Sequence, residues 1–187
     1  SACLVGSEMC IRDRLNTFQE EGVRALVLRG PSLALSVYPD SALRPCVDLD
    51  LLVCPEQIVQ ARTILERLGY KCLSKRFETA REFFREEEFV YKKYPRSNLL
   101  VDLHWVNWEL HPFFASAQNQ GVEDLFSRAC KVNSSALSFK TFHPVDALIQ
   151  AAVHLTMIHG REIRLIWIND ISLLAKQLRV PDDWEAL

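Results

Sequence analysis

Two aspartates stand two residues apart inside the apolar stretch RPCVDLDLLV. The β-branched and apolar residues around them predict a buried strand over residues 47–53. Alternate side chains of a strand share a face, so Asp48 and Asp50 point one way and the apolar residues beside them point the other. Two carboxylates confined to a half-buried strand repel each other, at a cost on the order of several kcal/mol, unless a positive charge lies between them. A hard divalent cation is the natural candidate.

A third acid occurs in a second predicted strand, within NLLVDLHW. Val101 and Leu103 take the core face there, and Asp102 shares the opposite face with His104. Asp102 would complete a site of three carboxylates. For His104 two interpretations stay open: it orients a carboxylate, contacts substrate or joins the metal shell, or it only forms hydrogen bonds within the core.

A strand, a glycine and a helix follow one another in LRGPSLA, upstream of the aspartates. Backbone N–H groups at the start of a helix bind anions such as phosphate. Gly30 would let the backbone approach a phosphate closely, and Ser32 would add a hydroxyl. Arg44, just before the aspartate strand, either neutralises phosphate charge or is a solvated loop arginine.

The composition is that of an ordinary globular protein, with 187 residues, 49% of them apolar, and a net charge of −2. This balance gives no support for a dedicated DNA-binding or membrane-surface protein, because such proteins usually carry a basic excess. The six cysteines form no CxxC pair, which favours reduced thiols and a cytoplasmic location. The sequence shows neither an apolar run long enough to span a bilayer nor a signal peptide.

The order of predicted elements divides the chain into three parts. Residues 1–14 resemble a translated library-adaptor sequence and are expected to lie outside the fold, although the start of an amphipathic helix is the alternative. Residues 15–105 alternate strands and helices, and residues 106–187 read as helices, ending without a closing signal as in a truncated chain. The acidic REEE run is interpreted as a solvated face.

The ordered motifs VLRGPSLALSVYP, LRPCVDLDLLV, LGY, LLVDLHW and HPVDALIQAAVHLTMIHG…IWINDISLL resemble the uncharacterised nucleotidyltransferase family of the polymerase-beta superfamily. The resemblance covers residues 22–178. It implies an α+β fold, with a mixed β-sheet flanked by helices and a C-terminal helical subdomain. It also implies a metal-dependent transfer of a nucleoside monophosphate from an NTP to an acceptor that the sequence does not identify.

The resemblance assigns roles to the motif residues. Asp48 and Asp50 would bind two Mg²⁺ ions, for which Mn²⁺ could substitute, and Asp102 would hold the catalytic ion and orient or deprotonate the acceptor hydroxyl. Gly30 and Ser32 would cradle the triphosphate. Arg29, which stands where the family commonly has lysine, would also contact phosphate, but through a planar fork that need not reach the same place. A second departure from the family pattern is Pro31, which removes one N–H group from the turn.

Four further residues of the helical half recur in that family: His154, His159, Trp167 and Asp170. The two histidines lie about 140° apart on a helix, unlike the one-face pair of zinc hydrolases. The four residues either line the nucleotide or acceptor pocket or form an interhelical hydrogen-bond network. Two alternatives to the enzyme remain: a non-catalytic nucleotide- or metabolite-binding module, and a toxin- or antitoxin-like partner protein. The oligomeric state does not follow from the sequence.

Overall fold

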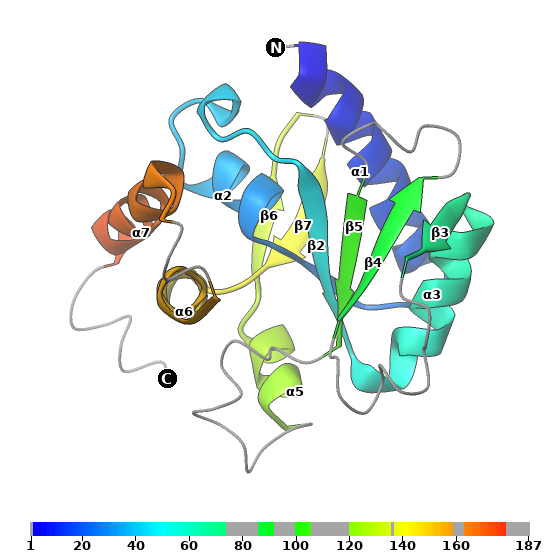
Figure 1. Ribbon diagram of the computed structural model, residues 1–187. Helices are drawn as coiled ribbons and strands as arrows, with labels where there is room; N and C mark the ends of the chain where they lie inside the picture. Colours follow the sequence, from blue (N-terminus) through cyan, green and yellow to red (C-terminus); the bar gives the residue numbers. More distant parts are fainter. Residues whose placement is uncertain are drawn as a thin grey trace.

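A five-stranded mixed sheet forms the centre of the protein (Figure 1). The computed structural model describes residues 2–73, 86–91, 100–105, 120–135, 137–158 and 163–178. β2 and β5 are parallel neighbours, and the other pairs are antiparallel. The strands stand in the order β1 (Ala25–Leu28), β2 (Asp48–Val53), β5 (Leu100–His104), β4 (Glu86–Tyr91) and β3 (Tyr70–Cys72).

One face of the sheet is covered by α1 (Ala2–Glu20) and α3 (Ile58–Arg67), and Figure 1 shows α1 running behind the strands. Ile11, Leu15 and Phe18 are buried against this face, at the helical spacing of an apolar stripe. The helix continues through residue 14 without a break. The assignment of residues 1–14 to a segment outside the fold stays a prediction, but Ile11 at its end belongs to the main core.

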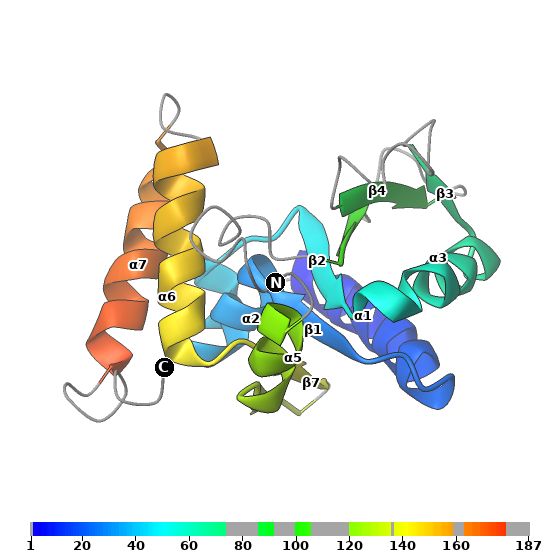
Figure 2. The same cartoon turned by 90° about the horizontal axis from the view of Figure 1, so that it is seen from below.

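The other face carries the remaining helices. Leu26, Leu28 and Leu52 pack there against α5 (Gln120–Ser127). Figure 2 shows α6 (Pro144–Val153) and α7 (Leu165–Gln177) side by side, at the end of the molecule opposite α3. A π-helical turn, His154–Ile158, follows α6. The connections include α2 (Arg29–Ser36), η1 (Ser41–Leu43) and η2 (Pro55–Gln57).

A β-hairpin interrupts the helical half of the chain. It consists of β6 (Cys130–Asn133) and β7 (Ser138–Thr141), and the Thr141 hydroxyl donates to the Val27 carbonyl of β1 at 2.7 Å. The prediction of helices alone after residue 105 is wrong here, because alternating residues in two four-residue runs carry only a weak strand signal. The boundaries 15–105 and 106–187 stay predictions.

The mixed sheet with flanking helices confirms the α+β fold class expected from the sequence. No helix in the described segments is both long and apolar enough to cross a membrane.

Candidate functional site

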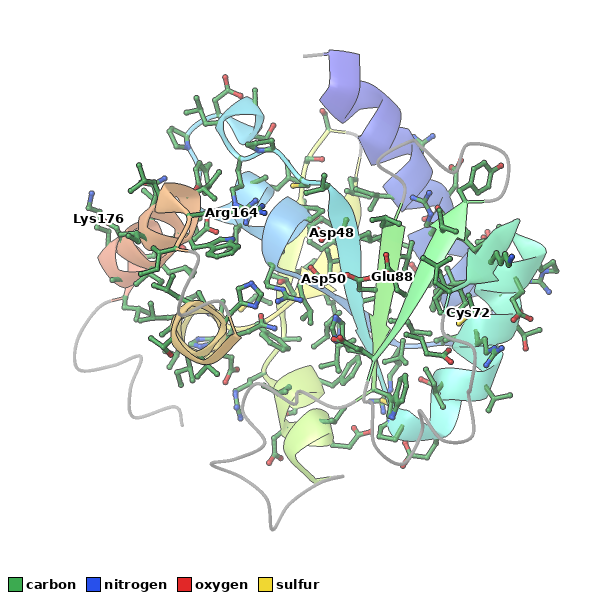
Figure 3. The ribbon with its side chains drawn as sticks, viewed as in Figure 1. Asp48, Asp50, Cys72, Glu88, Arg164 and Lys176 are labelled. Carbon is green, nitrogen blue, oxygen red and sulfur yellow. The ribbon has the colours of Figure 1, made fainter. Side chains whose placement is uncertain are left out.

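The three predicted acids lie on two neighbouring parallel strands at the centre of the sheet. Asp50 of β2 and Asp102 of β5 are direct Cα partners, and Asp48 stands two residues before Asp50. Neighbouring strands lie about 4.8 Å apart, and partners in register share a face. The register therefore puts the three acids on one face of adjacent strands, and their role as a metal site stays a prediction. Figure 3 shows Asp48 and Asp50 one after the other on β2, over the middle of the sheet.

Asp50 is the most enclosed of the three acids, with 3% of its surface exposed. Arg29 donates to both of its oxygens, from Nε to Oδ2 at 3.3 Å and from Nη2 to Oδ1 at 2.5 Å. His104 Nε2 lies 3.1 Å from Oδ1. Burial alone would raise the pKa of Asp50, but the positive charge of Arg29 and the contacts of His104 hold that pKa well below its ordinary value. Asp50 is thus an ionised carboxylate in a buried place.

The negative charges of Asp102 and Asp48 are less well balanced by positive groups than the charge of Asp50. Burial raises the pKa of Asp102 to about 7, and the charge of Asp50 adds to the effect. Burial and the charge of Asp50 also raise the pKa of Asp48. Like charges on one face disfavour ionisation, so the group of three acids calls for a cation.

The donor set fits a hard divalent cation by its chemistry, since carboxylate oxygens are the ligands that Mg²⁺ and Mn²⁺ prefer. Within the described ranges, however, no three His, Cys, Asp or Glu side chains stand close enough together to hold a metal ion. Arg29 supplies the positive charge instead, because its guanidinium takes both oxygens of Asp50.

His104 lies between two carboxylates. It is 4% exposed, and its Nδ1 stands 3.3 Å from Oε2 of Glu86 while its Nε2 faces Asp50. This arrangement favours the interpretation that His104 orients Asp50. Any contact with substrate stays a prediction.

The expected phosphate-binding turn lies where β1 leads into α2. Arg29, the first residue of α2, has a positive φ of 45°. Gly30 is needed for packing, because a Cβ there would meet Cys46 Sγ at 3.1 Å and Cys46 Cβ at 3.3 Å. The Ser32 hydroxyl donates to the Arg29 carbonyl at 2.8 Å. Pro31 falls in the first helical turn, where a missing N–H is tolerated. Binding of phosphate by this turn stays a prediction.

Arg44 is not a solvated loop arginine. It is 9% exposed and donates to Asp170 of α7 from Nε and from Nη2, each at 2.9 Å, while Nη1 donates to the Pro45 carbonyl. Tyr38 also donates to Asp170, at 2.6 Å. Arg44 therefore joins the segment before β2 to the helical half, and its predicted contact with phosphate stays a prediction.

The helical half reaches the site through His154. Its Nδ1 lies 2.7 Å from Nη1 of Arg29, and its ring meets Trp167 edge-on at 5.4 Å between centroids. Asp170 takes part in the Arg44 contact instead. His154, Trp167 and Asp170 thus form contacts between elements, as one of the two interpretations expected, and His159 lies outside the described residues.

The REEE run is not a simple solvated face. Glu87 is 1% exposed on the face covered by α1 and α3 and pairs with Arg62, whereas Glu88 is the direct partner of Asp102. Figure 3 shows Glu88 over the same part of the sheet as Asp50. The sequence interpretation missed Glu86 and Glu88 as neighbours of the site. The strand period of two along residues 86–91 was the signal that could have found them.

Solved structures with the same fold are nucleotidyltransferases or resemble them. The antibiotic-resistance factor ANT(2'')-Ia matches over 97% of this chain and 89% of its own, with a TM-score of 0.67 and 12% identity. The lincosamide antibiotic adenylyltransferase LnuA, bound to lincomycin, matches over 88% and 93%, with a TM-score of 0.53 and 16% identity. An antigenic nucleotidyltransferase-like protein from Paracoccidioides brasiliensis matches over 91% and 80%, with a TM-score of 0.55 and 12% identity. At such identities the likeness establishes the fold alone.

Comparison of the sequence itself gives the family. No curated protein matches the chain. The family described as uncharacterised nucleotidyltransferase matches residues 12–187, which include the three acids and the turn before α2. The protein therefore belongs to the uncharacterised nucleotidyltransferase family and is an enzyme of nucleotidyl transfer.

Proposed function

We propose that the protein moves a nucleoside monophosphate from an NTP to a hydroxyl group of an acceptor, with divalent metal ions bound at the three acids. The observation that carries the proposal is the register of β2 and β5, which pairs Asp50 with Asp102 and leaves Asp48 on the same face. Three hard oxygen donors on adjacent strands are what such a reaction requires of the protein.

Each acid has a distinct part in this proposal. Asp48 and Asp50 would hold two Mg²⁺ or Mn²⁺ ions, and Asp102 would share one of them. When bound, the ions neutralise the triphosphate and stabilise the departing pyrophosphate. Asp102 would orient the acceptor hydroxyl and take its proton. The acceptor oxygen would form a bond to the α-phosphorus. The bond between the α-phosphorus and the oxygen bridging it to the β-phosphorus would break, and pyrophosphate would leave.

The donor nucleotide would meet the start of α2. Backbone N–H groups of Gly30 and Ser32 would face the phosphates, with Arg29 as the nearest cation, and Arg44 would act only if it left Asp170. The relatives suggest which reagents to try first. One structure of ANT(2'')-Ia contains adenylyl-2''-tobramycin, so ATP and small molecules with hydroxyl groups are the first donor and acceptors to test. A cytoplasmic location is part of the proposal, since Cys46, Cys54 and Cys130 are free thiols.

A screen of the purified protein tests the proposal. The protein is incubated with each of the four NTPs, Mg²⁺ or Mn²⁺, and a cell extract with labelled acceptors, and release of pyrophosphate is measured. Release should depend on metal and vanish in Asp48→Ala. It should persist in Asp124→Ala, which removes an exposed acid of α5.

Other outcomes would support the alternatives. Calorimetric binding of ATP with Mg²⁺ that Asp48→Ala abolishes, without pyrophosphate release under any condition, would contradict turnover and identify a binding module. A stable protein that co-purifies through the helical half, with no binding of nucleotide, would identify a partner protein instead.

A further inference from the structure

We propose that Arg29 is a built-in counter-ion of Asp50, which releases this carboxylate when a divalent cation binds and then contacts the nucleotide phosphate. His154 holds the guanidinium in reach of both places. The inference rests on the proposed metal-dependent function and adds to it the residue that competes with the metal.

The competition follows from which atoms are occupied. Arg29 Nε and Nη2 contact the two oxygens of Asp50, at 3.3 and 2.5 Å. These are the oxygens that a cation would need. The Asp50 side chain is 4% exposed and that of Arg29 is 19% exposed, so water does little to screen the pair. A buried carboxylate without a partner is strongly disfavoured, and Arg29 keeps Asp50 ionised until another positive charge replaces it.

His154 gives the guanidinium a second anchor. Arginine has five N–H donors and no acceptor, so Nδ1 of His154 accepts from Nη1 of Arg29, at 2.7 Å. This third contact does not involve Asp50 and can persist when the other two are lost. His154 is itself placed by its edge-on contact with Trp167 of α7. The helical half thereby determines where the arginine remains after it leaves the carboxylate.

The position of Arg29 in the fold suits the exchange. It is the first residue of α2 and has a φ of 45°, a conformation that costs a residue other than glycine some free energy. The same residue stands at the helix start, where backbone N–H groups favour an anion. Arg29 therefore contacts the carboxylate site through its guanidinium and belongs to the expected phosphate-binding turn through its backbone.

A calorimetric titration with Mn²⁺ alone measures metal affinity and tests the proposal without any turnover. Arg29→Gln should bind Mn²⁺ about tenfold more tightly than the wild type, because the competing cation is gone. In the presence of saturating Mn²⁺ the same variant should bind ATP more weakly. A folded Arg29→Gln whose affinity for Mn²⁺ is unchanged or lower overturns the proposal, and unchanged ATP affinity overturns the role at the phosphate.

Arg62→Gln is the matched control. Arg62 has a similarly covered side chain, 25% exposed, and also pairs with a buried carboxylate, Glu87, but on the opposite face of the sheet. It should leave the affinity for Mn²⁺ as it is. An equal gain in Arg62→Gln would show an effect of net charge and would overturn the proposal.

A second variant keeps the test decisive if Arg29→Gln does not fold. Arg29→Lys keeps a positive charge but loses the paired N–H contacts with both oxygens of Asp50, so Mn²⁺ should bind about threefold more tightly. Unchanged Mn²⁺ affinity in a folded Arg29→Lys overturns the competition. His154→Leu removes only the acceptor for Nη1, so ATP should bind more weakly in saturating Mn²⁺, while the affinity for Mn²⁺ alone should stay as it is, because the contact is present before and after the exchange. His154→Gln offers an acceptor oxygen and should return the affinity for ATP toward the wild type. Unchanged ATP affinity in His154→Leu contradicts its anchoring role. If the wild type binds no Mn²⁺ at all, the metal dependence proposed above fails as well, whereas binding that Arg29 does not affect overturns only this inference.

Discussion

Asp102 is the acid of the site whose charge is least compensated. Burial and the charge of Asp50 raise its pKa to about 7, from an ordinary value near 4. A folded state with the higher pKa holds the proton more tightly than the unfolded chain does. The resulting stabilisation is complete below about pH 4 and is lost as the pH rises toward 7. Without metal, the protein therefore loses stability at neutral pH because of a residue that the proposed reaction needs.

Asp102→Asn should make the metal-free protein more stable while it abolishes nucleotidyl transfer. Asparagine imitates the protonated acid at every pH, so its advantage should grow between pH 4 and pH 7 and then level off. Thermal unfolding in EDTA measures this, with an expected gain of about 3 °C or more at pH 8.5 and a smaller one at pH 5. Glu56→Gln, which removes an exposed carboxylate beyond the other end of β2, should show no such trend. A gain that is the same at both pH values would contradict the explanation.

At the scale of elements, the corner between β1 and α2 has a packing role and a predicted ligand-binding role. Gly30 packs against Cys46, which precedes β2, and the same residue was predicted from sequence to approach a phosphate. The two roles have different consequences for a substitution. If packing requires the glycine, the loss of stability on replacing Gly30 depends on the side chain of Cys46. If only the ligand requires it, that loss does not depend on Cys46.

Gly30→Ala should destabilise the protein by about 1 kcal/mol, because the added Cβ would stand 3.1 Å from Cys46 Sγ. Cys46→Ala removes that sulfur, so the double variant should regain much of the loss. Urea unfolding of the two single variants and the double variant measures the coupling energy. Strictly additive effects would exclude the packing role. ATP binding of the stable double variant then reports on the phosphate role alone.

The elements that the sequence predicted best are those with local signals. A strand period of two placed Asp48 and Asp50 on one face, and the succession of strand, glycine and helix in LRGPSLA predicted the corner between β1 and α2. The β6–β7 hairpin was missed because its strands are short and lie in a stretch without strong apolar alternation. Glu88 was missed because an acidic run resembles a solvated surface until its partner strand is known.

At the scale of the whole molecule, the helical half is attached to the sheet by contacts that no local pattern reveals. Arg44 and Asp170 are 126 residues apart in the chain, and Arg29 and His154 are 125 apart. The sequence identified these residues as charged or recurrent, but it could not pair them. Gln177 of α7 adds a hydrogen bond to the Ser36 carbonyl of α2 at 2.9 Å. Both arginines predicted for phosphate are thus tied to the helical half as well.

The Arg44–Asp170 pair offers a test of how the two halves depend on each other. Arg44→Leu should cost about 3 kcal/mol in the free energy of unfolding. Among the residues that the structure describes, it leaves the buried Asp170 with the Tyr38 hydroxyl and without a cation. Arg44→Leu combined with Asp170→Leu removes both charges and should recover most of that loss, as urea unfolding would show. If the stable double variant binds ATP as the wild type does, Arg44 serves only to attach α7. If ATP binding stays weak although stability has returned, the arginine also acts on the nucleotide, and Asp170 then sets how far it can reach.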